Sequence, residues 1–166
     1  MVIRPRSDAD SDALVALLTD VNASDGYPPL VARDDLGAFL LGHPARAAWV
    51  AEVDGAIVGH VALHDRSLDE TMIAASAALG VPEDALGVVA RLFVGAAGRG
   101  RGIGEALLAI ATAEARAQGR EPILDTWEEL SNAIALYDRC GWRRVAEVSA
   151  AIRDTTIGVY VYAAPA

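Results

Sequence analysis

A glycine-rich stretch past the middle of the chain combines small residues with two arginines, where an apolar strand pattern changes to a helical one. Glycine occupies positions 98, 100, 102 and 104, and Arg99 and Arg101 alternate with these glycines. The first amides of a helix have no partner inside the helix, and the helix dipole adds partial positive charge there. Glycine lets an anion come close to such amides because it has no side chain. The stretch therefore predicts a pyrophosphate-binding loop over residues 99–104.

Two other classes of phosphate-binding protein fit this stretch poorly. A P-loop ATPase would need Gly-Lys-Ser or Gly-Lys-Thr at the start of the helix, whereas Gly104 is followed here by Glu105 and Ala106. A dinucleotide-binding fold would place its glycines after the first strand of a βαβ unit, and these glycines lie past mid-chain. The remaining alternative is a flexible surface turn without a ligand.

The elements that must position this loop alternate along the whole chain. Strand patterns occur at residues 2–4, 48–53, 56–63, 88–94, 123–127, 144–151 and 156–163. Helical patterns begin at Ser7 or Asp8 and at Asp34, and others cover residues 69–79, 103–118 and 131–140. We therefore expect one α/β domain over residues 1–166, with residues 66–87 as an insertion between two strands.

Three positions inside the strand patterns predict local geometry. Asp54-Gly55 supplies the positive φ that a tight hairpin turn requires. Gly59 predicts a bulge or a close approach by another backbone. Arg91 interrupts an apolar strand, and a buried arginine needs a partner. It could face a substrate site or a carboxylate such as Asp125, or it could lie on the solvent side of the sheet.

Composition bounds the remaining classes of function. The chain has 166 residues, 53% of them hydrophobic and 22% charged, which argues against disorder. The net charge of −9 gives no attraction to nucleic acid and favours a cationic partner. A lone cysteine, Cys140, permits no internal disulfide and no cysteine-based metal cluster. The N-terminus lacks the apolar run of a signal peptide, and no stretch is long and apolar enough for a membrane span, so a cytoplasmic protein is expected. The high alanine content and the excess of arginine over lysine indicate a bacterial source, and three scattered histidines predict no metal site.

Two segments together resemble the GNAT superfamily of N-acetyltransferases. The run from Arg99 to Gly104 resembles the family pattern (Arg or Gln)-x-x-Gly-x-(Gly or Ala), and Ala133 to Trp142 resembles the closing Ala-x-x-Leu-Tyr-x-x-x-Gly-(Phe or Trp) segment. The order of elements is similar as well. The resemblance implies a mixed, mostly antiparallel central sheet of about seven strands, flanked by about four helices, with central strands that splay apart.

The resemblance also implies an activity and a set of cofactor contacts. The expected reaction moves an acetyl group from acetyl-CoA to a primary amine of a small molecule or peptide by direct attack. Backbone groups of Leu92, Phe93 and Val94 would pair with the pantetheine arm, and the Val94 amide could stabilise the carbonyl oxygen. The pyrophosphate would lie on the loop formed by Arg99, Gly100, Arg101, Gly102, Ile103 and Gly104. A homodimer is the family-level expectation, and acceptor specificity would depend on the early helices and residues 66–87.

Tyr137 matches the family tyrosine that often donates a proton to the departing thiolate of coenzyme A. The alternative is an aromatic core residue, because Ile134 lies on the same helix face. Glu128 ranks first with Glu129 as the base that deprotonates the amine, since both follow a splayed strand; the other candidates are Glu52, Asp125, His60 and His64. Many family members carry an asparagine upstream of the tyrosine, but this sequence has Leu130 there. Asn132 could instead cap the helix, and Cys140 is expected to pack rather than react.

One other function remains open at the level of sequence. A coenzyme A-binding module without catalysis would keep the glycine-rich loop, but it would need neither Tyr137 nor a base. The presence of Tyr137 favours the enzyme.

Overall fold

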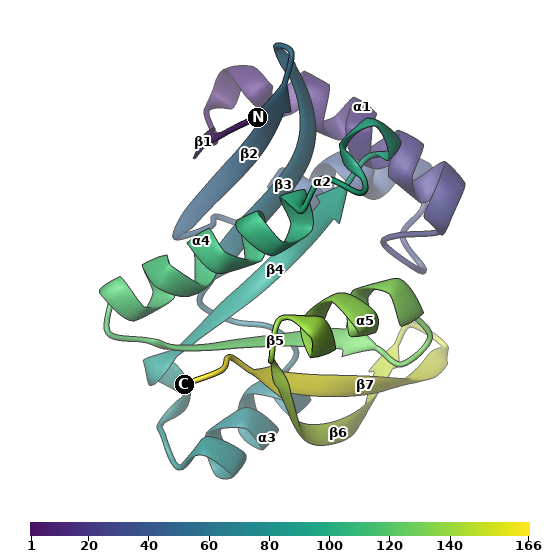
Figure 1. The fold of residues 1–166 in the computed structure, drawn as a ribbon. Helices are drawn as coiled ribbons and strands as arrows, with labels where there is room; N and C mark the ends of the chain where they lie inside the picture. Colours follow the sequence, from purple (N-terminus) through teal and green to yellow (C-terminus); the bar gives the residue numbers. More distant parts are fainter. The chain divides into compact units, whose positions relative to one another are not determined.

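Seven strands hydrogen-bond in the order β1-β2-β3-β4-β5-β7-β6 in the computed structural model, which describes residues 1–166 (Figure 1). The strands are β1 (Val2–Pro5), β2 (Ala47–Val53), β3 (Ala56–His64), β4 (Leu86–Val94), β5 (Glu121–Trp127), β6 (Arg143–Ile152) and β7 (Thr155–Ala163). The helices are α1 (Ser11–Asp25), α2 (Leu36–Leu41), α3 (Asp69–Leu79), α4 (Ile103–Ala117) and α5 (Ser131–Arg139). The expected mixed α/β fold is confirmed, with five helices in place of about four.

Element ends differ from the sequence predictions by a few residues. The central strand begins at Leu86 rather than at residue 88, so the segment predicted as an insertion ends before residue 86. Strand β5 begins at Glu121, two residues before the predicted start at residue 123, and includes Pro122. Short 3-10 turns, Asp8–Asp10 and Arg33–Asp35, precede α1 and α2 and delay the start of both helices. The hairpin turn has φ of 52° at Asp54 and 79° at Gly55, as the Asp-Gly pair predicted.

The chain divides into two compact units: residues 1–62 with 91–111, and residues 63–90 with 112–166. In the first unit, α1 and α2 share an apolar core with β2 and the end of β4; its fully buried side chains include Leu14, Leu18, Leu36, Leu40 and Val50. Helix α4 approaches β3 from the side opposite to α1 and α2 (Figure 1). A Cβ at Gly59 would lie 3.0 Å from the Leu107 side chain, so this strand glycine permits the close approach.

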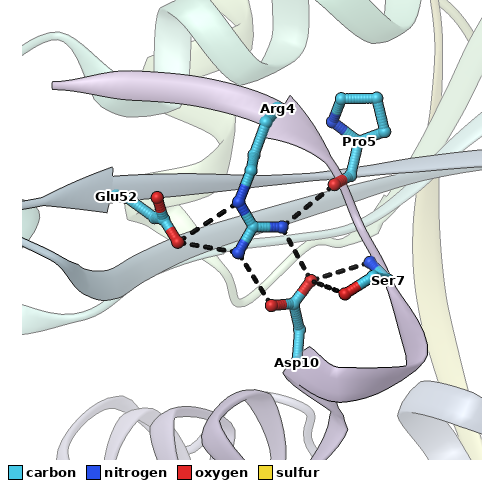
Figure 2. Close-up of polar contacts among 5 residues, drawn as sticks. All are labelled: Arg4, Pro5, Ser7, Asp10 and Glu52. Atoms are coloured by element: carbon cyan, nitrogen blue, oxygen red, sulfur yellow. Dashed lines mark hydrogen bonds and ion pairs between the residues drawn. The ribbon is translucent and has the colours of Figure 1, made fainter.

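Within the first unit, a polar cluster joins β1 to β2 and to the segment before α1 (Figure 2). Arg4 of β1 donates to both carboxylate oxygens of Asp10, at 2.8 Å each, and its Nη2 donates to Glu52 of β2 at 2.7 Å. Asp10 also accepts from the backbone and side chain of Ser7. The hydrogen bonds from Arg4 hold the pKa of the Asp10 carboxyl well below its usual range. Arg4 also donates to the Glu52 carboxylate, which therefore lies beside a positive charge.

In the second unit, α3 and α5 cover opposite faces of β5, β7 and β6 (Figure 1). Val161 of β7 lies in a buried cluster with Met72 and Ala75 of α3. Its neighbour Tyr162 faces the other way, and its ring centroid is 5.7 Å from that of Tyr137 of α5. Strand β5 therefore has one face toward α3 and one toward α5, because alternate side chains of a strand point to opposite faces.

The parallel pairing of β4 with β5 is short. Leu86, Gly87 and Val88 pair with Glu121, Pro122 and Ile123, and the pairing ends there. The pairings of β1 with β2, of β5 with β7 and of β6 with β7 are antiparallel. The mostly antiparallel sheet with separating central strands thus agrees with the expected fold. None of the helices is long and apolar enough to cross a membrane.

Candidate active site

The glycine-rich loop presents a run of backbone amides with no partner inside the protein. The amide of Arg99 donates to the Ala96 carbonyl and that of Ala106 to the Gly102 carbonyl, whereas the five amides from Gly100 to Gly104 donate to no group of the chain. Gly100 and Gly102 have φ of 71° and 72°, a left-handed conformation that glycine adopts without strain. Residues 99–102 are exposed. The amides at the N-terminus of α4 are therefore free to bind an anion.

The two loop arginines differ in their surroundings. Arg99 forms an ion pair with Asp25 at the end of α1, and its Nε donates to the Val94 carbonyl at 3.4 Å. Arg101 is exposed and forms no ion pair or hydrogen bond with the chain. The Arg99 side chain thus holds the loop to α1 and β4, whereas the charge of Arg101 is available to bind a ligand.

The end of β4 presents backbone groups in two directions. The Gly95 amide donates to the Val58 carbonyl of β3 at 2.9 Å. Successive amides of a strand point to opposite sides. The amides of Val94 and Leu92 therefore point away from β3, and the Phe93 amide points toward it. Phe93 is buried, and its ring stacks on His60 at 5.4 Å between centroids. The amides of Val94 and Leu92 are therefore the better placed of the three predicted backbone contacts.

Arg91 has a left-handed backbone inside β4, with φ of 52°, which is unusual for a residue with a side chain. Its carbonyl accepts a hydrogen bond from His60 Nδ1 at 2.9 Å, and its Nε donates to the Phe39 carbonyl at 2.7 Å. The guanidinium also lies 4.8 Å from the centre of the Phe39 ring. Arg91 therefore joins β4 to α2. The sequence identified the residue but did not predict the irregular backbone.

Both ring nitrogens of His60, a candidate base, have partners within the protein. His60 is fully buried, and Nδ1 must carry a hydrogen because it contacts a carbonyl oxygen. Nε2 then accepts from Arg6 at 3.3 Å. Both ring nitrogens are occupied. His64 is also buried, and no group of three histidine, cysteine or acidic side chains is arranged to hold a metal ion.

Tyr137 lies in an aromatic cluster of the second unit. Its side chain is 8% exposed, and its ring centroid is 6.4 Å from that of Trp142 and 5.7 Å from that of Tyr162. Burial raises the pKa of Tyr162, whose hydroxyl donates to Asp138 at 3.3 Å. The helix that carries Tyr137 begins after Leu130, so Asn132 is not its N-cap, and Cys140 is partly buried at its end. The ring of Tyr137 therefore serves packing whatever its hydroxyl does.

The acidic candidates occupy different environments. Glu128 and Glu129 are exposed in the turn after β5, and the Glu128 carboxylate lies over Gly158 of β7. A Cβ at Gly158 would come within 2.4 Å of the carboxylate carbon of Glu128. Asp125 accepts hydrogen bonds from Ser67 and Thr71. Glu52 is bound to Arg4. Glu128 and Glu129 are thus the acidic candidates whose carboxylates form neither an ion pair nor a hydrogen bond with another side chain.

Thr126 was not singled out from the sequence. Its hydroxyl is buried and has no hydrogen-bond partner in the chain. Thr126 pairs in register with Tyr160 of β7, on the β5 face that also carries Leu124 opposite Tyr162. A buried hydroxyl without a partner costs free energy, so a ligand that supplied one would be favoured. The composition of a strand does not reveal such a group.

Comparison with known proteins places this chain in a family. The model of the Acetyltransferase (GNAT) family matches residues 16–142. An N-acetyltransferase from Staphylococcus aureus Mu50 has a TM-score of 0.69 at 18% identity, with 98% of this chain and 96% of that chain covered. The yncA protein from Salmonella typhimurium, solved with its cofactor acetyl-CoA, has a TM-score of 0.68 at 20% identity, with 98% and 92% covered.

A ribosomal-protein-alanine N-acetyltransferase from Brucella melitensis has a TM-score of 0.68 at 21% identity, with 98% of each chain covered. No curated protein matches the chain. These structural likenesses support the fold, and the family model extends over well more than half of the sequence. The chain belongs to the GNAT family of acetyltransferases.

Proposed function

We propose that this protein transfers an acetyl group from acetyl-CoA to a primary amine of a small molecule or peptide. The observation that carries the proposal is the run of five unpartnered amides at the head of α4, in a chain of the GNAT family. A diphosphate offers acceptor oxygens and negative charge, which such amides and the helix dipole bind well. The free Arg101 side chain adds a mobile positive charge beside them.

The residues of this chain fit acetyl-CoA as the acyl donor. Two of the five bare amides belong to glycines with positive φ, and a Cβ at either would meet nothing within 4 Å. The diphosphate can therefore reach the backbone without moving a side chain. We assign Arg99, Gly100, Arg101, Gly102, Ile103 and Gly104 to the diphosphate, and Leu92, Phe93 and Val94 to the pantetheine arm.

Three residues of the chain would supply the chemistry. The Val94 amide, which points away from β3, would donate a hydrogen bond to the carbonyl oxygen of the thioester as charge develops there. Glu128 would take a proton from the amine, directly or through a water molecule, so that the nitrogen can attack the carbonyl carbon. The carbon–sulfur bond then breaks, and the Tyr137 hydroxyl would give its proton to the thiolate of coenzyme A.

The test is an acetylation screen with a panel of amines that detects free thiol. We expect thiol release that requires both acetyl-CoA and an amine. Binding of coenzyme A without thiol release from any amine would favour the alternative, a coenzyme A-binding module without catalysis. Absence of coenzyme A binding would overturn both functions.

A further inference from the structure

Asp125 is a half-buried carboxylate that has two hydroxyl donors but no cation. Ser67 Oγ and Thr71 Oγ1 donate to the same oxygen, Oδ2, at 2.5 and 2.6 Å. The other oxygen, Oδ1, accepts no hydrogen bond from the chain, and Asp125 forms no ion pair. A partly buried carboxylate is normally neutralised by a cation or by several donors on both oxygens. Asp125 is thus half satisfied, with one oxygen available.

The two donors come from the segment that the sequence marked as an insertion. Ser67 precedes α3, and Thr71 lies in its first turn and is fully buried. Asp125 pairs in register with Val161, which belongs to the buried cluster under α3. The carboxylate therefore lies on the α3 face of β5, the face opposite to Tyr137.

Tethering of α3 does not explain the whole arrangement. The apolar cluster of Met72, Ala75, Val161 and others already holds the helix to the sheet. One neutral acceptor would suffice for two hydroxyls, since an asparagine side-chain oxygen has two lone pairs. A charged group in this place retains an attraction that no residue of the chain uses.

We propose that Asp125 binds the positive charge of an acceptor that carries a second cationic group besides the amine that is acetylated. The proposal rests on the acetyltransferase function. The attacking amine must be neutral, so a lasting positive charge on the bound acceptor belongs to another group, such as a second ammonium. Ser67 and Thr71 fix Oδ2, which leaves Oδ1 to accept the hydrogen bond from that ammonium. The net charge of −9 attracts the same class of acceptor.

The test compares α,ω-diamines with amino alcohols of the same chain length as acceptors. We expect kcat/KM for at least one diamine to exceed that of its amino alcohol, because only the diamine carries the second charge. Asp125→Asn keeps the shape and an acceptor oxygen but removes the charge. It is expected to lower kcat/KM for the diamine by roughly ten- to hundredfold, while the amino alcohol and the KM for acetyl-CoA change little.

Glu70→Gln is the matched control, because Glu70 is an exposed acid of α3 whose side chain forms no hydrogen bond or ion pair. It should leave the preference for diamines unchanged. The inference is overturned if wild type prefers no diamine, or if Asp125→Asn and Glu70→Gln keep the same preference. Calorimetry of the same pairs in the presence of coenzyme A gives a second readout. Loss of acetyl transfer with retained diamine binding at Asp125 would contradict the proposed function alone.

Discussion

The packing of the Tyr137 ring can be tested separately from the chemistry of its hydroxyl. Trp142 and Tyr162 border the ring, and neither of these contacts needs the hydroxyl. Tyr137→Phe keeps the ring and these two contacts, so we expect the variant to fold. If the hydroxyl protonates the thiolate, kcat should fall roughly 10²- to 10⁴-fold, with the KM for acetyl-CoA unchanged. Steady-state thiol detection measures both constants, and an unchanged kcat would remove Tyr137 from the mechanism.

The contact between Glu128 and Gly158 offers a way to move a carboxylate without replacing it. A methyl group at Gly158 would collide with the Glu128 carboxylate, which can rotate into solvent at little cost because it ends a flexible side chain. Gly158→Ala should therefore lower kcat by at least about tenfold and change the free energy of unfolding by less than about 1 kcal/mol. Measurement of kcat and of urea unfolding tests both expectations.

A double-mutant cycle supplies the control for that prediction. Glu128→Gln should lower kcat through loss of the base, and adding Gly158→Ala to it should have no further effect. Additive losses would mean that Gly158 acts through another group. A normal kcat in Glu128→Gln would return the role of base to Glu129.

Among the elements, α4 has a glycine with positive φ near each end, so the ligand binding of its N-terminal loop can be compared with that of its C-terminal turn. Gly100 and Gly119 both have φ of 71°, and a Cβ at either would meet nothing within 4 Å. Alanine at each position should therefore cost a similar amount of stability, about 1 kcal/mol, through left-handed strain. Only Gly100→Ala should weaken coenzyme A binding, because only that methyl group would stand where the diphosphate approaches. Equal binding by both variants would contradict the loop assignment.

The polar cluster at the start of the chain predicts a pH dependence of stability. Arg4 holds the pKa of Asp10 below its ordinary value of about 3.9. Asp10 thus stabilises the fold fully above that value, and the contribution is lost as pH falls through the range below it. The difference in unfolding free energy between wild type and Asp10→Asn should shrink as pH falls below about 4. Asp12→Asn, at an exposed position without an ion pair, is the matched control.

Element types followed from local patterns, and most of their ends did not. Helix α3 is an exception with both ends as predicted, because its apolar spacing stops at Gly80, which takes the left-handed conformation of a helix end. The early start of β4 at Leu86 depends on pairing with β5, a contact distant in sequence. The left-handed Arg91 depends on His60 and Phe39 in the same way. Spacing along the chain carries no information on such partners.

At the scale of the molecule, family membership could be predicted because two motifs on different elements carry it. The loop at 99–104 and the segment at 133–142 each have residue types that chemistry constrains. The roles of individual acids could not be predicted, since Glu52 and Asp125 look alike in sequence. The fold binds Glu52 to Arg4 and leaves one oxygen of Asp125 without a partner. Specificity for the acceptor substrate depends on such contacts between residues distant in sequence.

We expect the bare amides of residues 100–104 to bind a diphosphate. Calorimetry of the purified protein with coenzyme A and with pantetheine, which lacks the diphosphate, measures this binding. We predict a single site for coenzyme A and at least roughly hundredfold weaker binding of pantetheine, because several hydrogen bonds to a charged group are lost. Equal binding of the two ligands, or no binding of coenzyme A, would contradict the claim.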